Sequence, residues 1–293
     1  MAISPAHRFG QIIGEVLEAA IVPVLKTFAR DHQLYLDQKG VRPCRSGRKC
    51  TWLDVNGNSH DLDFVLERGG SLRQVGVPVA FIETAWRRYT KHSRNKVQEI
   101  QGAIEPLAET FRNSRPFKGA VLGGVFTQGA LRQLKSLGYT VLYFSHDSVV
   151  AVFRQFGIDA AFDEDTADAE FQKKVDAFVN LSVSRKRSLT VRLVKAHQGD
   201  VDEFVKSLAV SISRQIERIV IIALHGAIHE VATIEDAIRF VESYEEDGRN
   251  KPIDRYEIEV RYNNGDAIHG KFKNKSSAVT FLTSYQPILP KIR

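Results

Sequence analysis

The stretch VPVAFIETAWRRYTKHSRNK, residues 77–96, decides how the fold is predicted. It begins as a short apolar run rich in β-branched and aromatic residues, which predicts a buried strand. The run ends in Glu83, and Ala85 follows two positions later. A basic segment without any acid comes next, formed by Arg87, Arg88, Lys91, Arg94 and Lys96. The stretch therefore places a carboxylate at the end of a buried strand, with a basic helix entrance behind it.

The segments before this strand predict a helix and a hairpin. Residues 9–32 carry apolar side chains at helical spacing, which predicts one long amphipathic helix that can bend at Pro23. A polar and basic loop, residues 37–50, follows the helix. Asn56-Gly57 then lies between two strand-like runs, which is a strong hairpin signal. The strand that ends in Glu83 is therefore expected to complete an antiparallel meander.

Helices and strands alternate after the basic segment. The predicted helices cover residues 93–111, 128–138 and 146–157, and the strands between them cover residues 117–127 and 139–145. A meander followed by alternating helices and strands predicts an α/β fold with a mixed central sheet flanked by helices.

An acidic segment, residues 159–170, marks the expected domain boundary. We therefore predict a catalytic domain over residues 1–160 and a C-terminal α+β domain over residues 161–293. The second domain is expected to begin with helices and to end with a hairpin turned at Asn264-Gly265 and a short helix. A role in DNA recognition or dimerisation would suit it, because SRKRS (184–188) and KFKNK (271–275) are strongly basic.

Composition narrows the class of protein. The chain has 293 residues, of which 43% are hydrophobic and 26% charged, as in soluble globular proteins. The net charge of +6 suits a polyanionic partner. No apolar run reaches the roughly 18 residues of a membrane span, and the N-terminus lacks a signal-peptide core. A cytoplasmic protein without a membrane partner is expected.

Two common site types find no support in the sequence. Cys44 and Cys50 are the only cysteines, which makes a zinc site a poor interpretation and free thiols in a reducing cytoplasm the expected one. The phosphate loop GxxxxGKS or GxxxxGKT is absent, and no GxGxxG follows a predicted strand. The sequence therefore predicts no nucleotide cofactor.

Two acids lie on neighbouring predicted strands. Asp63 is a polar residue in the apolar run LDFVLE, and Glu83 ends the next strand. Two carboxylates held close repel unless a cation lies between them, and hard oxygen ligands suit Mg²⁺. Such a metal polarises a phosphoryl oxygen and activates water, while the basic segment after Glu83 would neutralise backbone phosphates. The combination predicts metal-dependent phosphodiester hydrolysis.

These residues resemble the signature of the PD-(D/E)XK nucleases, which is an Asp, a spacer, then Glu or Asp, any residue, and Lys. Here it stands as Asp63, a spacer, and Glu83-Thr84-Ala85. The resemblance covers residues 9–150, about half of the chain, and includes the order of elements. It implies a restriction-endonuclease-like core in which Asp63, Glu83 and the backbone carbonyl of Thr84 hold Mg²⁺.

Ala85 departs from the family pattern. In the family, the lysine at this position contacts the attacking water and the scissile phosphate, and so stabilises developing negative charge. Three interpretations stay open. The chain is a Lys-to-Ala variant of an active enzyme, or the lysine has migrated to Lys91 or Lys96, or the domain is naturally inactive and binds nucleic acid only.

Other acids are candidate auxiliaries. Glu15 and Glu18 lie in the first helix, where a helix acid can approach the metal. Glu15 is preferred because Gly14 before it would let the helix come close to the sheet. Asp61 is the second choice for the strand aspartate, and Glu67 would support the site from the same strand face.

The resulting prediction is an Mg²⁺-dependent DNA endonuclease, a type II-like restriction enzyme that acts on double-stranded DNA as a homodimer. A repair, recombination or RNA-processing nuclease is the alternative with the same chemistry. A non-catalytic nucleic-acid-binding module of the same fold is the alternative from another class. A third alternative is an α/β protein whose C-terminal half binds a protein partner.

Overall fold

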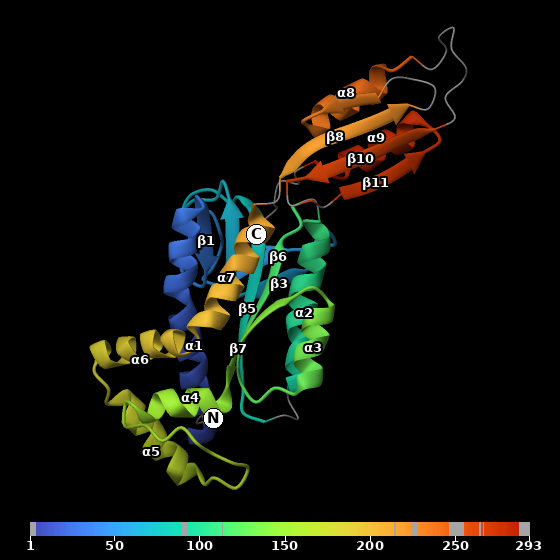
Figure 1. Cartoon of the computed structure of the whole chain (residues 1–293). Coiled ribbons are helices and arrows are strands. Elements are labelled where there is room, and N and C mark those ends of the chain that lie inside the picture. The colour runs from blue at the N-terminus through green and yellow to red at the C-terminus, as the bar shows by residue number, and fades with distance from the viewer. Residues whose placement is uncertain are drawn as a thin grey trace. The chain divides into compact units, whose positions relative to one another are not determined.

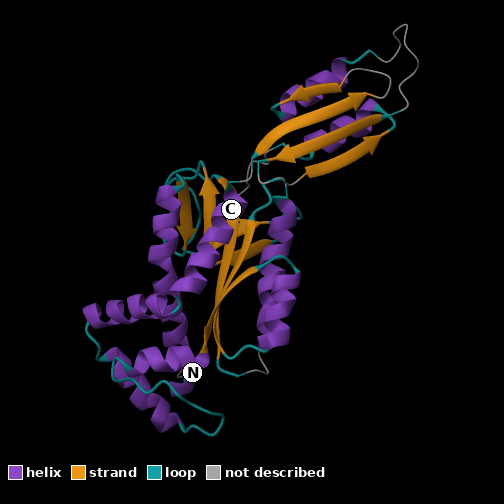
Figure 2. Cartoon of the chain, in the orientation of Figure 1, coloured by secondary structure: helices purple, strands orange, loops and turns teal. Residues whose placement is uncertain are grey.

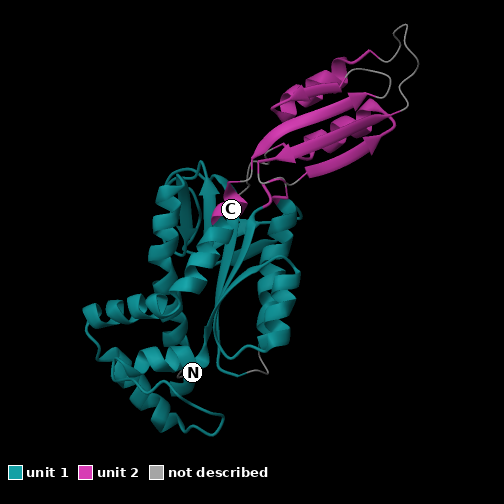
Figure 3. Cartoon of the chain, in the orientation of Figure 1, with its two compact units in different colours: residues 1–110, 116–208, 290–293 teal, residues 111–115, 209–289 magenta. Residues whose placement is uncertain are grey.

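The chain forms two compact units, coloured separately in Figure 3. The computed structural model describes residues 4–89, 93–112, 114–213, 215–223, 228–245, 255–263, 265 and 267–286. The first unit consists mainly of Met1–Thr110 and Pro116–Leu208, and the second of Phe111–Arg115 and Ala209–Leu289. Each unit has its own sheet and helices, so the α/β class predicted from the sequence is confirmed.

A mixed five-stranded sheet is the centre of the first unit (Figure 1). Its strands, in spatial order, are β1 (Leu34–Gln38), β4 (Phe64–Arg68), β5 (Val77–Arg87), β6 (Phe117–Gly124) and β7 (Thr140–Ser145). The first three strands pair antiparallel, and β5, β6 and β7 pair parallel. Antiparallel strands followed by parallel strands were predicted, but the first strand of the series is β1 and not the predicted strand before Asn56-Gly57.

Helices cover both faces of this sheet (Figure 2). The helices of the first unit, in chain order, are α1 (Pro5–Asp31), α2 (Ser93–Thr110), α3 (Gln128–Ser136), α4 (His146–Arg154), α5 (Asp168–Val179), α6 (Val183–Ala196) and α7 (Gln198–Ile212). Helix α1 is capped by Ser4, whose side chain accepts a hydrogen bond from the His7 amide, and it continues past Pro23. Helix α1 packs on β1, β5 and β6, and α2 packs on β5 and β6.

The predicted domain boundary at residue 160 falls inside the first unit. Helices α5 and α6, which follow this position, both pack against α1. Phe171 of α5 is buried and lies 6.2 Å, centroid to centroid, from the Phe9 ring of α1. The acidic segment is therefore a surface connection within one unit, because the helices after it bury their apolar side chains on the N-terminal helix.

The strands before β5 differ from the prediction. Strand β1 lies in a segment that the sequence pattern assigned to helix end and loop. The predicted hairpin exists as β2 (Cys50–Leu53) and β3 (Ser59–Leu62), with Gly57 at a φ of 83°, but it forms a separate two-stranded sheet. Asp63 lies at a bend between β3 and β4, where the chain leaves the hairpin and enters the central sheet.

A buried arginine ties together the loops that follow β1 and β4. The Arg42 side chain is 2% exposed and donates to both carboxylate oxygens of Glu67, at 2.5 and 2.9 Å. It also donates to the backbone carbonyls of Ser71 and Gln74. Burial opposes the charge on Arg42, but the hydrogen bonds that it donates to Glu67 and the negative charge of that carboxylate outweigh burial and raise the pKa of the guanidinium. Glu67 therefore fixes this ion pair and does not support the predicted site.

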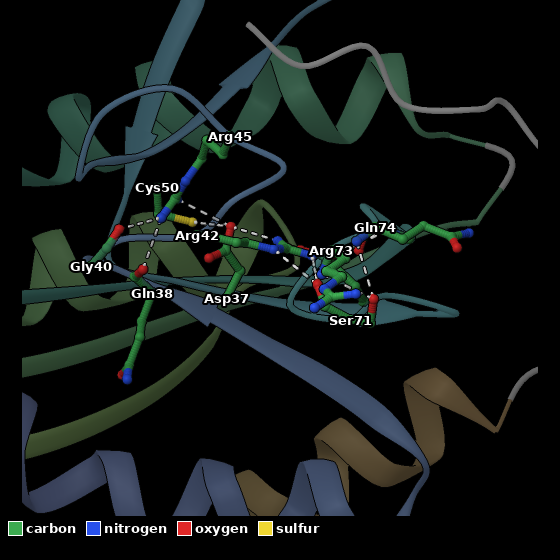
Figure 4. Close-up of polar contacts among 11 residues, drawn as sticks. Asp37, Gln38, Gly40, Arg42, Arg45, Cys50, Ser71, Arg73 and Gln74 are labelled. Atoms are coloured by element: carbon green, nitrogen blue, oxygen red, sulfur yellow. Dashed lines mark hydrogen bonds and ion pairs between the residues drawn. The ribbon is translucent and has the colours of Figure 1, made fainter.

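Asp37 extends the same network (Figure 4). Its carboxylate forms ion pairs with Arg42 at 3.0 Å and with Arg45 at 3.1 Å, and it accepts a hydrogen bond from the Cys50 thiol at 3.3 Å. Burial raises the pKa of the Cys50 thiol, and the charge of Asp37 adds to this effect. Cys44 and Cys50 are both free, and the protonated Cys50 acts as a hydrogen-bond donor inside the fold.

The second unit is an antiparallel sheet of order β11-β10-β8-β9 with two helices. Its elements are β8 (Ile216–Ala223), β9 (Ile228–Val231), α8 (Ile234–Ser243), β10 (Tyr256–Tyr262), β11 (Ala267–Phe272) and α9 (Lys275–Thr283). Its core is made by alternate strand residues and one face of each helix. Strands β10 and β11 pair as the predicted hairpin, although Asn264 lies outside the described residues. Lys271, in the predicted basic segment, is paired with Glu257 at 3.2 Å.

Among the helices that the structure describes, none is long and apolar enough to cross a membrane.

Candidate active site

The register between β4 and β5 brings Asp63 and Glu83 together. Phe64 lies opposite Ile82, so the next positions of the two chain segments face each other. The backbone amide of Asp63 donates to Glu83 Oε1 at 3.0 Å. Asp63 Oδ2 in turn accepts hydrogen bonds from the Thr84 amide at 2.7 Å and the Thr84 hydroxyl at 2.6 Å. The two predicted acids thus form one hydrogen-bonded unit, and Thr84 holds the aspartate in place.

Glu83 is the most perturbed carboxyl of this unit. It is 8% exposed. Burial raises its pKa to about 8, the charge of Asp63 adds to the increase, and the charge of Lys96 opposes it. At neutral pH and without a cation, the Glu83 carboxyl is therefore protonated. A bound cation would replace this proton and hold both groups as carboxylates.

Of the two helix acids, Glu18 and not Glu15 lies near the acid pair. Burial raises the pKa of Glu18, and the negative charge of Asp63 raises it further. The side chain of this helix residue therefore lies close enough to the acid pair to interact with its charge. Glu18 also acts on Glu83. The Glu15 side chain is 58% exposed and pairs with Arg8 at 3.0 Å. A Cβ on Gly14 would meet nothing within 4 Å, so this glycine does not bring the helix close to the sheet.

Asp61, the second choice for the strand aspartate, has other partners. It accepts a hydrogen bond from Lys49 Nζ at 2.6 Å and one from Thr51 Oγ1 at 2.5 Å, both in or beside the β2–β3 hairpin. The hydrogen bond from Lys49 and that from Thr51 lower its pKa. Its role is to fasten the hairpin.

A pocket of about 890 Å³ opens beside the acid pair. Helix α1, the end of β5 and the start of α2 line it, and its wall includes Glu18, Thr84, Ala85 and Lys96. Thr84, which donates two hydrogen bonds to Asp63 Oδ2, connects this wall to the acid pair, whose own side chains do not line the pocket. Ala85 is 6% exposed, and its methyl group leaves room for a longer side chain in the pocket.

Two buried donors line the same pocket. Trp86 Nε1 and Arg88 Nη1 are buried and have no hydrogen-bond partner within the described residues. Buried donors are nearly always paired in native proteins, so two unpaired ones in one pocket indicate a ligand that accepts hydrogen bonds. Packing holds both in place: a Cβ on Gly10 would be 3.9 Å from Trp86 Nε1, and the Arg88 guanidinium lies 4.4 Å from the Tyr89 ring centroid. An oxygen-rich anion would suit these two donors.

The five basic residues predicted to contact DNA have different surroundings. Arg87 and Lys96 both pair with Glu99, each at 3.2 Å. Arg94 is exposed on α2. Arg88 is not a free surface cation, because it packs over aromatic rings. Lys91 lies outside the described residues.

The donor set suits a hard divalent cation. Mg²⁺ takes one or two protein carboxylates and keeps several of its waters, and Asp63 and Glu83 supply two carboxylates with mutual repulsion to relieve. Within the described residues, no group of three or more His, Cys, Asp and Glu side chains is arranged to hold a metal ion. Glu18 therefore adds negative charge near the acid pair, and Asp63 and Glu83 are the two residues that suit the cation.

The raised pKa of Glu83 predicts that Mg²⁺ binding depends on pH. Below pH 8, a cation must displace the Glu83 proton, so the Kd is expected to fall about tenfold per pH unit up to pH 8 and to level off above it. Isothermal titration calorimetry between pH 6 and 9 measures this dependence. In two buffers of different ionisation enthalpy at pH 7, it should show release of about one proton per Mg²⁺. A Kd that does not change with pH would contradict the assignment.

A second cluster has the residue types of a nucleophilic triad but not its chemistry. His197 Nε2 lies 2.8 Å from Ser148 Oγ, and Asp200 lies 3.3 Å from His197 Nδ1. The Ser148 hydroxyl donates to the Ser145 carbonyl, so it accepts from the imidazole. A general base must take the serine proton, so this cluster is a structural tie between α4 and α7.

Comparisons with known proteins add no family. No family model matches the chain, and no curated protein matches it. A solved structure described as a protein of unknown function, AF1548, aligns at 10% identity over 67% of this chain and 94% of that one. The TM-score of this alignment is 0.28, so the likeness carries no argument about fold or function.

Proposed function

We propose that the chain is an Mg²⁺-dependent DNA endonuclease of the PD-(D/E)XK type, with Asp63 and Glu83 as its metal ligands. The observation that carries the proposal is the hydrogen-bonded pair of these acids, formed where the start of β4 faces the interior of β5, beside a pocket with two donors that have no partner among the described residues. The pair can hold a cation in place of the Glu83 proton, and the donors can bind the oxygens of an anion. A phosphodiester with Mg²⁺ would supply both the cation and the anion.

The connectivity of the central sheet supports the proposal. The family layout is a helix, a meander with Asp on its second strand and Glu on its third, then a helix and a strand. Leaving out the separate β2–β3 hairpin, the chain runs α1, β1, β4, β5, α2, β6. Asp63 directly precedes the second strand of this series, and Glu83 lies in the third. Strand β6 pairs parallel to β5.

Each residue of the site has a role in phosphodiester hydrolysis. Asp63, Glu83 and the backbone carbonyl of Thr84 would hold Mg²⁺, which when bound polarises the phosphoryl oxygen and activates water. The Thr84 hydroxyl fixes the orientation of Asp63. Trp86 Nε1 and Arg88 Nη1 would donate to the oxygens of the DNA backbone, which positions the substrate.

Lys96 takes the role of the lysine that Ala85 replaces. It lines the pocket together with Ala85, and its charge acts on Glu83. Glu99 holds its ammonium group at 3.2 Å. A cation fixed in this position would stabilise negative charge that develops on the scissile phosphate. Of the three interpretations of Ala85, the migrated lysine therefore has support from the geometry.

The biological setting that suits this chemistry best is a type II-like restriction endonuclease. The described part of one chain contains one such site, and a cut through both strands of a duplex needs two. A homodimer would supply the second site, as two-fold symmetry is the commonest way to pair identical subunits.

Cleavage of supercoiled plasmid DNA tests the proposal. In Mg²⁺, the chain is expected to linearise or nick the plasmid, and Asp63→Asn is expected to lower the rate by at least about 100-fold because a metal ligand is lost. Asp61→Asn is the matched control, since Asp61 fastens the hairpin and lies outside the acid pair. This control should cut at the rate of the unmodified chain.

The readout separates the remaining interpretations. Cleavage that persists in EDTA, or that Asp63→Asn leaves unchanged, would contradict the assigned site. Tight DNA binding without cleavage in any divalent cation would favour the non-catalytic binding module.

A further inference from the structure

Helix α6 carries an unusual concentration of positive charge. Its sequence VSRKRSLTVRLVKA contains five Lys and Arg residues and no acid. None of the five forms an ion pair with a carboxylate in the part of the chain that the structure describes. A surface helix of a globular protein usually mixes charges of both signs, so this face of the first unit is strongly electropositive.

Two of the five cations hold the helix in place. Arg185 donates to the Phe156 carbonyl at 3.4 Å, and Lys186 donates to the Val179 carbonyl at 2.9 Å. Leu189 and Leu193 on the opposite side of α6 are fully buried. The helix packs on α1 and α4. It is therefore a fixed platform and not a loosely attached arm.

The other three cations surround a second pocket. It has a volume of about 560 Å³ and lies between α6 and the end of α4. Arg187, Arg192 and Lys195 line it, together with the hydroxyl side chains of Ser184 and Ser188. Arg192 Nε donates to Gln155 Oε1 at 2.8 Å, which orients its guanidinium. The pocket thus offers cations and neutral donors to an anion, and no carboxylate lines it.

The spacing of these cations suits a phosphate backbone better than a single phosphate. Arg187 and Lys195 are eight residues apart, which is about 12 Å along an α-helix. One strand of duplex DNA carries a phosphate about every 3.4 Å of its axis, so 12 Å spans roughly three to four phosphates. Three cations along this length match one strand of a duplex.

We propose that Arg187, Arg192 and Lys195 of α6 form a second nucleic-acid contact, which binds the phosphate backbone of duplex DNA outside the active-site pocket. The contact rests on the proposed function for its ligand, because a nuclease must hold the duplex on both sides of the cut. It carries no sequence information, since it reads phosphates alone. Its contribution is affinity, which falls with ionic strength.

Fluorescence anisotropy with a labelled mixed-sequence 30-bp duplex, in EDTA, tests this contact without any cleavage. The variant replaces Arg187, Arg192 and Lys195 with glutamine. The control variant removes the same charge elsewhere, with Lys26→Gln, Arg132→Gln and Lys135→Gln on exposed positions of α1 and α3. Both variants are checked for folding by circular dichroism and thermal unfolding.

The expected result is a Kd at least about tenfold weaker for the α6 variant near 100 mM salt, and a slope of log Kd against log salt that is smaller by about 3. The control should keep the slope of the unmodified chain. Equal slopes for both variants would overturn the contact. Binding of inorganic pyrophosphate below about 1 mM that the three α6 substitutions abolish, while the affinity for duplex stays unchanged, would also overturn it and would assign the pocket to a small phosphate ligand.

The two experiments distinguish a failure of the α6 contact from a failure of the proposed nuclease activity. Loss of DNA affinity in the α6 variant, together with no cleavage by the unmodified chain in Mg²⁺, would keep the contact and remove the nuclease. Cleavage without any effect of the α6 variant on affinity would remove the contact and keep the nuclease.

Discussion

Replacing Glu83 with glutamine is expected to stabilise the first unit at alkaline pH. The folded chain keeps the Glu83 proton up to a pKa of about 8, whereas the unfolded chain releases it near 4.5, the ordinary pKa of a glutamate. The folded state therefore binds more protons between these values, so stability is highest below pH 4.5 and falls as the pH rises to 8. The loss is on the order of 4 kcal/mol at pH 9. Glutamine carries no charge, so it avoids this loss.

The measurement is thermal unfolding of both proteins between pH 5 and 9. At pH 9 the glutamine variant is expected to melt about 10 °C higher than the unmodified chain, and at pH 5 the two should be similar. Mg²⁺ should raise the melting temperature of the unmodified chain but not that of the variant, because binding to the folded state alone stabilises it. A melting temperature that Glu83→Gln lowers at every pH would contradict the account.

Glu67→Gln is a control that is expected to change the stability in the opposite direction. Glu67 is also a fully buried glutamate on the neighbouring strand, but its carboxylate is paired with Arg42. Removing its charge leaves the buried Arg42 guanidinium with Asp37 as its remaining carboxylate partner and weakens a buried ion pair, which costs up to about 3–5 kcal/mol. A destabilised Glu67→Gln beside a stabilised Glu83→Gln would separate a structural ion pair from a cation site.

Lys96→Ala is expected to lower the rate of DNA cleavage by about 10²- to 10³-fold, with a smaller effect on DNA affinity. The reason is that a fixed cation beside the scissile phosphate acts mainly on the transition state. Adding Ala85→Lys to the same variant should restore much of the rate, because position 85 opens into the same pocket. Single-turnover cleavage in Mg²⁺ with saturating enzyme measures both effects.

The control for this series is Lys135→Ala, an exposed lysine on α3. It should cleave at the rate of the unmodified chain. Full activity of Lys96→Ala would contradict the migrated lysine. If the chain is inactive and Ala85→Lys alone creates activity, the lysine belongs at position 85 and the chain is a Lys-to-Ala variant.

The acid pair could be predicted from the sequence because its signal is local. Asp63 interrupts an apolar run, and Glu83 ends another, so each is visible within a few residues. The register that joins them follows from two adjacent antiparallel strands. The hairpin at Gly57 and the alternation of helices and strands are local signals of the same kind.

Other features depended on contacts between distant segments. Glu18 and Glu15 are both acids on one amphipathic helix, and only the packing of α1 on the sheet brings Glu18 into the field of Asp63. Glu67 was predicted beside the site because of its spacing from Asp63, but its partner Arg42 comes from a loop 25 residues earlier. Strand β1 was not predicted, because five residues are too few to show a clear alternation.

The central claim is that Asp63 and Glu83 hold a divalent cation for phosphodiester hydrolysis. Crystals of the chain soaked in Mn²⁺, with anomalous diffraction recorded above the manganese edge, test it most directly. The account predicts the strongest anomalous peak about 2.1 Å from carboxylate oxygens of both Asp63 and Glu83, and its loss in crystals of Glu83→Gln. Strong manganese peaks elsewhere on the chain, with none at these two side chains at pH 8.5, would contradict it.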